Sequence, residues 1–196
     1  MSTQPCLILA STSQYRAGLL KRLGVEFQAI GPEVDETAAK QAFEDPVKLS
    51  VHLAVRKTMT VAEQKPEAIV IGGDQVGYCN GQLLEKPGDF ETAKQQLRHM
   101  AGQEVHLLTA TAIAVKGKLY QTNLGLNRLT MLSLAEEQIE RYLNFDEPFD
   151  CAGSFKLESQ GIALFKAIET TDPTSIEGLP LIYVASVLRK LGLTIP

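Results

Sequence analysis

The residues best suited to chemistry follow a short apolar segment near the N-terminus of the chain. Residues 7–10 are predicted to form a strand, and Ser11, Ser13 and Arg16 come next, before leucines at helical spacing begin. The first N–H groups of a helix lack internal partners and lie at the positive end of the helix dipole, so they bind anions. Arg16 adds a planar set of donors suited to phosphate. The segment predicts a phosphate-bearing ligand, although on its own it is better explained by helix capping through its hydroxyls.

Acidic residues follow the next predicted strand, which covers residues 27–30. The run Pro32-Glu33-Val34-Asp35-Glu36 places three carboxylates close together. Mg²⁺ prefers carboxylate oxygens and is commonly held by one or two of them plus substrate phosphates. Glu33 and Asp35, together with Asp74, are therefore candidate ligands of a divalent cation. The alternative is a solvated acidic loop.

Asp74 lies between two apolar segments, residues 68–71 and 76–79, directly after Gly72 and Gly73. An unpaired charge would be costly between such segments, and glycines allow a ligand to approach the backbone closely. An aspartate in this position can bind a metal ion or accept a proton from water. The alternative is a turn in which Asp74 binds its own backbone, but the apolar flanks favour a functional role.

Two lysines and a glutamate complete the set of candidates. Lys57 lies on a predicted helix, and Lys86 precedes Pro87, which favours an extended backbone that directs the lysine away from the following helix. Without further context, both are better explained as ordinary solvated lysines. Glu158 follows the small residues 152–154 and could accept two hydrogen bonds from the N–H edge of a guanine-type base. It could equally be an exposed glutamate after a tight junction.

The elements that must position these residues alternate between strand and helix patterns. Strands are predicted over residues 7–10, 27–30, 68–71, 76–79, 82–84, 105–115, 119–132 and 162–168. Helices are predicted over residues 14–23, 46–63 and 90–100, from a capping box at Ser133–Glu136 to 144, and from 180 to 191. Asn80-Gly81 predicts a tight hairpin. We therefore expect an α/β protein with a long bent mixed β-sheet flanked by helices, and two lobes around a central cleft within a single domain, 1–196.

Composition limits the possible partners and the compartment. The net charge of −4 gives no general attraction to nucleic acid or to anionic membranes. No apolar run approaches the ~20 residues that span a bilayer. Cys6, Cys79 and Cys151 are widely spaced and suggest neither a disulfide framework nor a zinc site. The expected partner is a small anionic molecule, and the expected compartment is the cytoplasm.

In combination, these motifs resemble the Maf family of nucleoside triphosphate pyrophosphatases from residue 7 to about residue 191. The motifs are Leu-Ala-Ser-x-Ser-x-x-Arg at 9–16, Pro-Glu-Val-Asp-Glu at 32–36, Gly73-Asp74, Lys86-Pro87, Ala152-Gly153-Ser154 and Gly178-Leu179-Pro180. The resemblance implies an ITPase-like cleft fold, usually as a homodimer. It also implies hydrolysis of the α–β phosphate bond of a nucleotide with a divalent cation, Mg²⁺ or Mn²⁺.

The resemblance also implies roles for single residues. Asp74 matches the family's proton acceptor, and the family's other polar cleft residues are matched by Ser11, Arg16, Glu33, Lys57 and Lys86. With Ser13 included, the phosphate-binding set is Ser11, Ser13, Arg16, Lys57 and Lys86.

Three positions indicate the branch of the family. Tyr15, Gln75 and Glu158 stand where the thymidine/uridine-type members carry Arg, Thr and Gln, and they resemble the branch that hydrolyses 7-methyl-GTP. That branch usually has Trp at the place of Tyr15, but a tyrosine ring can also stack on a cationic methylated purine. A pyrophosphatase for dTTP, UTP or another modified nucleotide stays an alternative, as does a nucleotide-binding regulator of cell division with little turnover.

Overall fold

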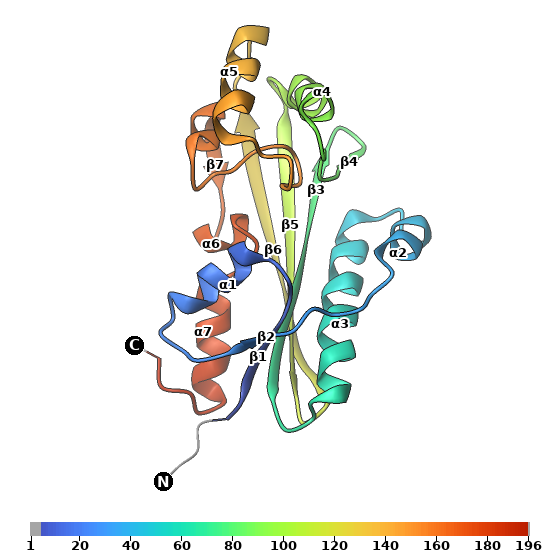
Figure 1. The fold of residues 1–196 in the computed structure, drawn as a ribbon, viewed down its shortest axis with the longest axis vertical. Helices are drawn as coiled ribbons and strands as arrows, with labels where there is room; N and C mark the ends of the chain where they lie inside the picture. The colour runs from blue at the N-terminus through green and yellow to red at the C-terminus, as the bar shows by residue number, and fades with distance from the viewer. Residues whose placement is uncertain (1–4, 196) are drawn as a thin grey trace. The chain divides into compact units, whose positions relative to one another are not determined.

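The computed structural model describes residues 5–195 of the chain. Within these residues the strands form one seven-stranded sheet in the order β2-β1-β3-β5-β6-β7, with β4 paired to β3 (Figure 1). The strands are β1 (Leu7–Ala10), β2 (Gln28–Ala29), β3 (Ile69–Cys79), β4 (Gln82–Leu84), β5 (Glu104–Val115), β6 (Lys118–Met131) and β7 (Phe165–Glu169). The helices are α1 (Gln14–Lys21), α2 (Glu36–Ala42), α3 (Pro46–Gln64), α4 (Phe90–Met100), α5 (Glu136–Asp146), the 3₁₀ helix η1 (Gln160–Leu164), α6 (Pro173–Ile176) and α7 (Leu181–Lys190). The predicted α/β fold with a mixed sheet flanked by helices is confirmed.

The chain divides into two compact units that interleave along the sequence. Unit 1 contains the described residues up to Asp74, then residues 109–125 and those from Asp172 onward. Unit 2 contains residues 75–108 and 126–171. The boundaries fall inside β3, β5 and β6, so these long strands contribute residues to both units. The single domain over 1–196 and its central cleft stay predictions.

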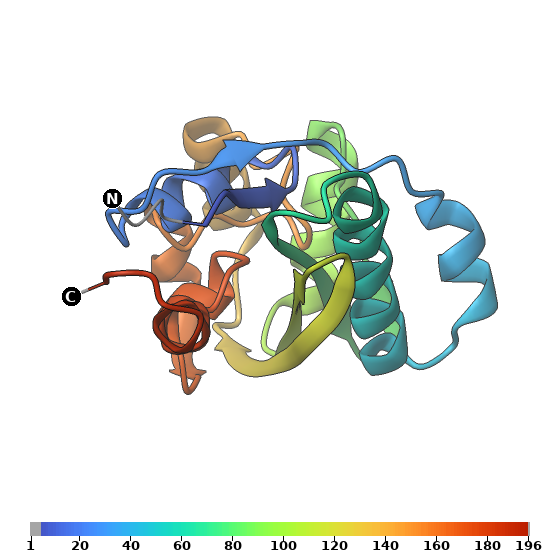
Figure 2. The same ribbon diagram turned by 90° about the horizontal axis from the view of Figure 1, so that it is seen from below.

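The core of unit 1 is built on both faces of its parallel strands. β1 pairs in parallel with β2 and with β3. Leu7 and Leu9 pack with α1 and α7, whereas Ile8 and Ala10 pack with α3. Strands that are buried on both faces read as continuous apolar runs rather than alternating ones, which explains the sequence of β1. Figure 2 shows α3 and α7 on opposite sides of these strands.

Unit 2 combines a hairpin with two packed helices. The β3–β4 hairpin turns at Asn80 and Gly81, whose φ angles of 45° and 84° suit a type I′ turn, so the predicted hairpin is confirmed. α4 and α5 lie against each other, and Glu136 of α5 pairs with Lys94 and Arg98 of α4. β7 pairs antiparallel with the end of β6.

β3 differs from its prediction because the two apolar segments form one strand. The strand continues from Ile69 to Cys79 without a turn, so Gly72, Gly73 and Asp74 have extended backbone. The packing of α3 explains one glycine: a Cβ on Gly72 would lie 2.2 Å from Thr58 Oγ1. The glycine is therefore needed for the close approach of the helix, whatever else binds nearby.

One helix was not predicted, and another begins later than its sequence pattern indicates. α2 was not predicted, and it buries only Ala39, so its sequence carries little amphipathic signal. Asp35 is its N-cap. α5 has Ala135 rather than Ser133 as its N-cap, because the side chain of Gln138 accepts a hydrogen bond from the Ala135 N–H at 2.8 Å. The predicted C-terminal strand over 162–168 is divided between η1 and β7.

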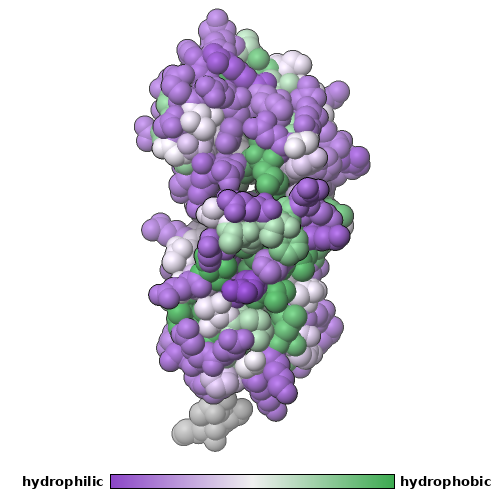
Figure 3. Space-filling model, turned by 90° about the vertical axis from the view of Figure 1, so that its right-hand side faces the viewer, coloured by the Kyte–Doolittle hydropathy of each residue, from purple (hydrophilic) through white to green (hydrophobic). Residues whose placement is uncertain are grey.

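The surface is predominantly polar on the side of the molecule drawn in Figure 3. Hydrophilic residues cover most of that view, and hydrophobic residues form patches between them. No helix among residues 5–195 is both long enough and apolar enough to cross a membrane.

Candidate functional site

The loop between β1 and α1 is organised by its two predicted hydroxyl residues. Ser13 caps α1, with its Oγ accepting a hydrogen bond from Arg16 N–H at 3.3 Å. The buried Ser11 hydroxyl accepts a hydrogen bond from Ser13 N–H at 3.1 Å. The capping explanation is thus confirmed for Ser13. Each hydroxyl also has an O–H that can donate to a ligand oxygen, so capping and phosphate binding are compatible.

Arg16 is fixed by the backbone before α7. Its Nε donates to the Gly178 carbonyl at 2.9 Å. Desolvation lowers the pKa of Arg16, while the nearby carboxylates of Asp74 and Glu36 act in the opposite direction. Gly178 has φ of +108°, and a Cβ there would lie 3.5 Å from Arg16 Nε. The Gly-Leu-Pro motif therefore has a local task, which is to bring a carbonyl against the guanidinium.

Lys57 lies between two carboxylates of unit 1. Its Nζ is 2.6 Å from Asp74 Oδ1 and 2.7 Å from Glu36 Oε1. The side chains of Lys57 and Asp74 are 12% and 9% exposed, whereas that of Glu36 is 46% exposed. Asp74 thus has the partner that a buried carboxylate requires. The structure brings Arg16, Lys57 and Asp74 into one charged cluster, and it adds Glu36, which the sequence had placed only in the acidic run.

The other two predicted metal ligands have different surroundings. Glu33 and Asp35 are both exposed. Asp35 caps α2, with its Oδ1 accepting from the N–H groups of Thr37 and Ala38 at 3.0 and 3.1 Å. Their role as metal ligands stays a prediction.

The acidic side chains near Lys57 could supply some of the ligands of a divalent cation. Residues 5–195 contain no group of three or more His, Cys, Asp or Glu side chains that could hold a metal ion by themselves. Mg²⁺ commonly needs only one or two carboxylates when substrate phosphates supply further oxygens. Asp74 and Glu36, which flank the same ammonium group, fit that requirement.

The remaining predicted residues belong to unit 2, except for Tyr15. Gln75 follows Asp74 on β3. Lys86 is exposed on the segment before α4, and Glu158 is exposed on the segment before η1. Tyr15, on α1 of unit 1, is 37% exposed. A joint arrangement of Tyr15, Gln75 and Glu158 around a base stays a prediction.

Two hydrogen-bond networks hold the segment that carries Glu158, and neither was predicted. In the first, Gln96 of α4 donates to the Glu85 carbonyl at 3.0 Å and accepts from Ser154 Oγ at 2.7 Å. The Gly153 N–H also donates to the Glu85 carbonyl, at 3.4 Å. A glutamine on an amphipathic helix gives no sequence signal for such a role.

The second network comes from the C-terminal end of α5. The buried Asp146 carboxylate accepts from Ser159 Oγ at 2.5 Å and from Gly161 N–H at 3.2 Å. Tyr142 OH accepts from Lys156 N–H at 2.9 Å, and burial raises the pKa of Tyr142. These contacts lie on both sides of Glu158, so its backbone is anchored although its side chain is exposed.

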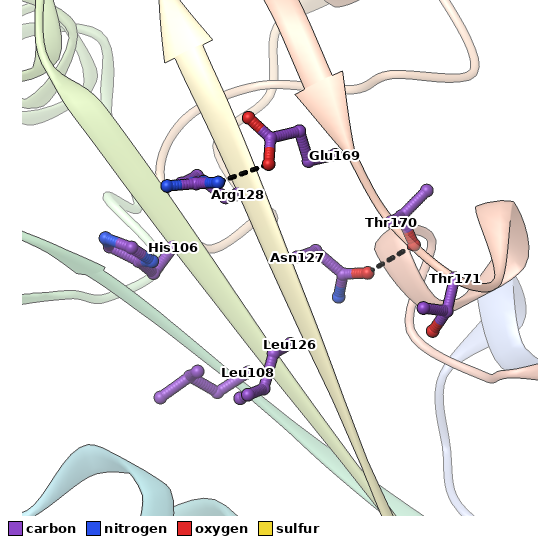
Figure 4. A pocket seen from close by; sticks show the side chains of 8 residues that line it. All are labelled: His106, Leu108, Leu126, Asn127, Arg128, Glu169, Thr170 and Thr171. Carbon is purple, nitrogen blue, oxygen red and sulfur yellow. Dashed lines mark hydrogen bonds and ion pairs between the residues drawn. The ribbon is translucent and has the colours of Figure 1, made fainter.

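A separate cavity of about 510 Å³ lies in unit 2 (Figure 4). Arg128 points toward Glu169 and pairs with it, and Thr170 Oγ1 donates to Asn127 Oδ1 at 2.7 Å. None of the predicted site residues lines the cavity. Its complete lining is His106, Leu108, Leu126, Asn127, Arg128, Glu169, Thr170 and Thr171.

Comparison with known proteins identifies relatives over nearly the whole chain. Residues 6–191 match the family model described as Maf-like protein. A protein of Xanthomonas axonopodis pv. citri named 7-methyl-GTP pyrophosphatase is 47% identical over 98% of this chain and 100% of its own length. A protein of the same name from Bordetella avium is 44% identical over 98% of this chain and 96% of its own length.

Among solved structures, the Staphylococcus aureus Ham1 protein resembles the chain. The TM-score is 0.50 with 12% sequence identity, and the match covers 94% of this chain and 98% of the other. At this identity the similarity concerns the fold alone.

Proposed function

This chain belongs to the Maf family, and we propose that it hydrolyses the α–β phosphate bond of 7-methyl-GTP to give 7-methyl-GMP and pyrophosphate. The observation that carries the proposal is the charged cluster of Arg16, Lys57 and Asp74, in a chain whose full-length relatives at 47% and 44% identity bear that name. Phosphoryl transfer depends mainly on positioning and charge stabilisation, and this cluster offers both.

Asp74 is proposed as the proton acceptor. A water oxygen forms a bond to the α-phosphorus, the bond from that phosphorus to the bridging oxygen breaks, and pyrophosphate leaves with the bond electrons. The water proton passes to the Asp74 carboxylate. Arg16 and Lys57, with Lys86 and the hydroxyls of Ser11 and Ser13, would bind the phosphate oxygens.

A divalent cation, Mg²⁺ or Mn²⁺, is proposed as the cofactor. Asp74 and an acidic residue of the 32–36 run would hold it, and the contact of Glu36 with Lys57 supports Glu36 in addition to Glu33 and Asp35. When bound, the cation would neutralise charge on the phosphates. Chelation should abolish turnover and added Mg²⁺ or Mn²⁺ should restore it. Full activity after exhaustive chelation would reject the cofactor.

Tyr15, Gln75 and Glu158 are proposed to select the base. Methylation at N7 makes the ring cationic, which favours stacking on an aromatic face, and a carboxylate can accept from both the N1–H and the exocyclic amine of guanine. The deciding measurement compares kcat/KM for 7-methyl-GTP, GTP, dTTP and UTP. We expect a preference for 7-methyl-GTP, and a preference for dTTP or UTP would overturn the substrate while leaving a pyrophosphatase.

Catalysis by Asp74 has its own test. Asp74→Asn preserves shape and removes the proton acceptor, so turnover should fall by about 10²–10⁴, the usual contribution of a general base. Near-normal turnover in a folded Asn variant would exclude the role.

We also infer a cytoplasmic homodimer. The family resemblance supports the dimer, and the three cysteines, none of which forms a disulfide within residues 5–195, suit a reducing compartment. Light scattering at micromolar concentration should give twice the mass of the chain, and a monomer would contradict the dimer.

A further inference from the structure

We infer that Gln96 is a positioning residue that sets base discrimination. It does so by joining the Lys86 segment, residues 85–88, to the Glu158 segment, residues 153–161. The inference rests on the proposed function, because it takes Lys86 as a phosphate contact and Glu158 as a base contact. It extends that function to a residue on α4 that would act only through the two segments it holds.

Both ends of the Gln96 amide are used, and each end holds a different segment. Its NH₂ group donates to the carbonyl of Glu85, the residue before Lys86, at 3.0 Å. Its carbonyl oxygen accepts from Ser154 Oγ at 2.7 Å. An amide with both partners satisfied has one orientation, so Gln96 adds a side-chain restraint on the spacing of the two segments to their direct contact, the hydrogen bond from Gly153 N–H to the Glu85 carbonyl at 3.4 Å.

The hydrogen bond from Ser154 to Gln96 matters because of the backbone conformation at Ser154. Ser154 is fully buried and has φ of 61°, a left-handed conformation that residues other than glycine rarely adopt. Such conformations persist only where the surroundings hold them. The hydrogen bond to Gln96 is one such restraint, and it acts four residues before Glu158.

The opposite side of the same segment is already anchored by Asp146 at Ser159 and Gly161. Gln96 and Asp146 therefore restrain the segment at both of its ends, from α4 and α5 respectively. Loss of the Gln96 restraint should leave the segment folded, because the Asp146 contacts remain. It should instead displace Glu158 and Lys86 relative to each other.

The test uses Gln96→Leu in the full chain, with Gln95→Leu as the matched control. Leucine has a similar size and good helix propensity but makes neither hydrogen bond. Gln95 is the exposed neighbour on the same helix. For Gln96→Leu, kcat/KM for 7-methyl-GTP should fall at least about tenfold, since a displacement near 1 Å can cost about a hundredfold. The kcat/KM for dTTP should fall less, so the ratio of kcat/KM for 7-methyl-GTP to that for dTTP becomes smaller.

Two further variants separate positioning from stability. Ser154→Gly removes one hydrogen bond and suits the left-handed backbone, so it should contract the ratio as well. The double variant of Gln96→Leu and Ser154→Gly should lower the ratio of kcat/KM for 7-methyl-GTP to that for dTTP no further than Gln96→Leu alone does. If Gln96→Leu does not fold, Gln96→Glu replaces it, because it keeps an acceptor for Ser154 and loses the donor to Glu85.

The outcomes distinguish the two proposals. A wild-type enzyme without preference for 7-methyl-GTP rejects the proposed substrate. A wild-type enzyme with that preference, whose ratio is unchanged in a folded Gln96 variant, rejects the positioning role. Equal losses for both substrates in that variant also reject it, because they indicate a structural effect only. Gln95→Leu should match the wild type within about twofold, and a contraction there would reject the specific assignment to Gln96.

Discussion

Replacing Lys57 by Met should destabilise the protein far more than replacing its partner Asp74 by Asn. The reason is the unequal burial of the two carboxylates beside Lys57. Without the ammonium group, Asp74 loses its hydrogen-bonded partner and keeps only the attraction of Arg16, while its side chain is only 9% exposed. Without the Asp74 charge, Lys57 still has Glu36 at 2.7 Å, and that side chain is 46% exposed.

The magnitudes follow from this asymmetry. Removing one partner of a buried ion pair costs about 3–5 kcal/mol, and the slight exposure of both groups places Lys57→Met near the lower end. Asp74→Asn leaves Glu36 as the counter-charge of both Lys57 and Arg16, and it should cost about 1 kcal/mol or less. For a chain of 150–250 residues, 1 kcal/mol corresponds to about 2–4 °C in Tm. We expect Tm to fall by about 6–12 °C for Lys57→Met and by less than about 4 °C for Asp74→Asn.

The assay is thermal unfolding followed by circular dichroism, with urea unfolding as an independent measure of the free energy. Lys48→Met is the matched control, because Lys48 is an exposed lysine on the same helix. The double variant of Lys57 and Asp74 should be more stable than Lys57→Met alone, since the buried carboxylate at that site is gone. Glu36 also loses Lys57 there, but its side chain is 46% exposed. Equal destabilisation by both single variants, or strict additivity in the double variant, would refute the reasoning.

Three further predictions concern stability. Gly72→Ala should lower the free energy of unfolding by about 1–3 kcal/mol, because its Cβ would lie 2.2 Å from Thr58 Oγ1; an unchanged urea midpoint would contradict this. Asp35→Ala should cost about 1 kcal/mol through loss of the α2 cap, whereas Asp35→Ser should cost less, and equal losses in urea unfolding would exclude the capping role. Hydrogen bonds from Arg98 and a neighbouring lysine lower the pKa of Glu136 from 4.5 to about 2; because the folded-state pKa is depressed, this stabilisation is present above pH 4.5 and is lost as the pH falls toward 2. Glu136→Gln should therefore flatten the decline of Tm between pH 5 and 2, and an identical slope in both proteins would show that the pair does not contribute.

The parts of the fold that could be predicted are those whose sequence pattern has a single physical cause. The continuous apolar run of β1, the Asn80-Gly81 turn and the Pro46 start of α3 are of this kind, because burial, positive φ and a missing N–H each restrict the sequence. α2 escaped prediction because it buries one small residue, Ala39. β3 was divided in two because glycines are usually breakers, whereas here Gly72 makes room for Thr58.

The candidate site shows the same limit. Asp74 could be predicted because a charge between two apolar segments is hard to explain by the local pattern. Arg16 and Lys57 had ordinary local explanations, capping and solvation, and were singled out by the family resemblance; the structure brings the three together. Glu36 and Gln96 could not be singled out. One is an ordinary first-turn acid and the other an ordinary helical glutamine, and their partners come from segments distant in the sequence. Contacts of this kind depend on tertiary packing, which no local pattern records.

The placement of α7 has a consequence for the synthesis of the chain. Val184 and Leu188 of α7 share a core with Leu7 and Leu9 of β1, although nearly the whole sequence separates them. A ribosome adds about 5–20 residues per second, so β1 waits roughly 10–40 s before this helix emerges to cover it. Throughout that interval the nascent chain exposes the part of the apolar strand face that α7 covers, and exposed apolar surface of this kind is what chaperones bind. A premature stop codon before α7 would make the exposure permanent, and we expect the shortened product to be degraded or to aggregate even though it keeps Arg16, Lys57 and Asp74.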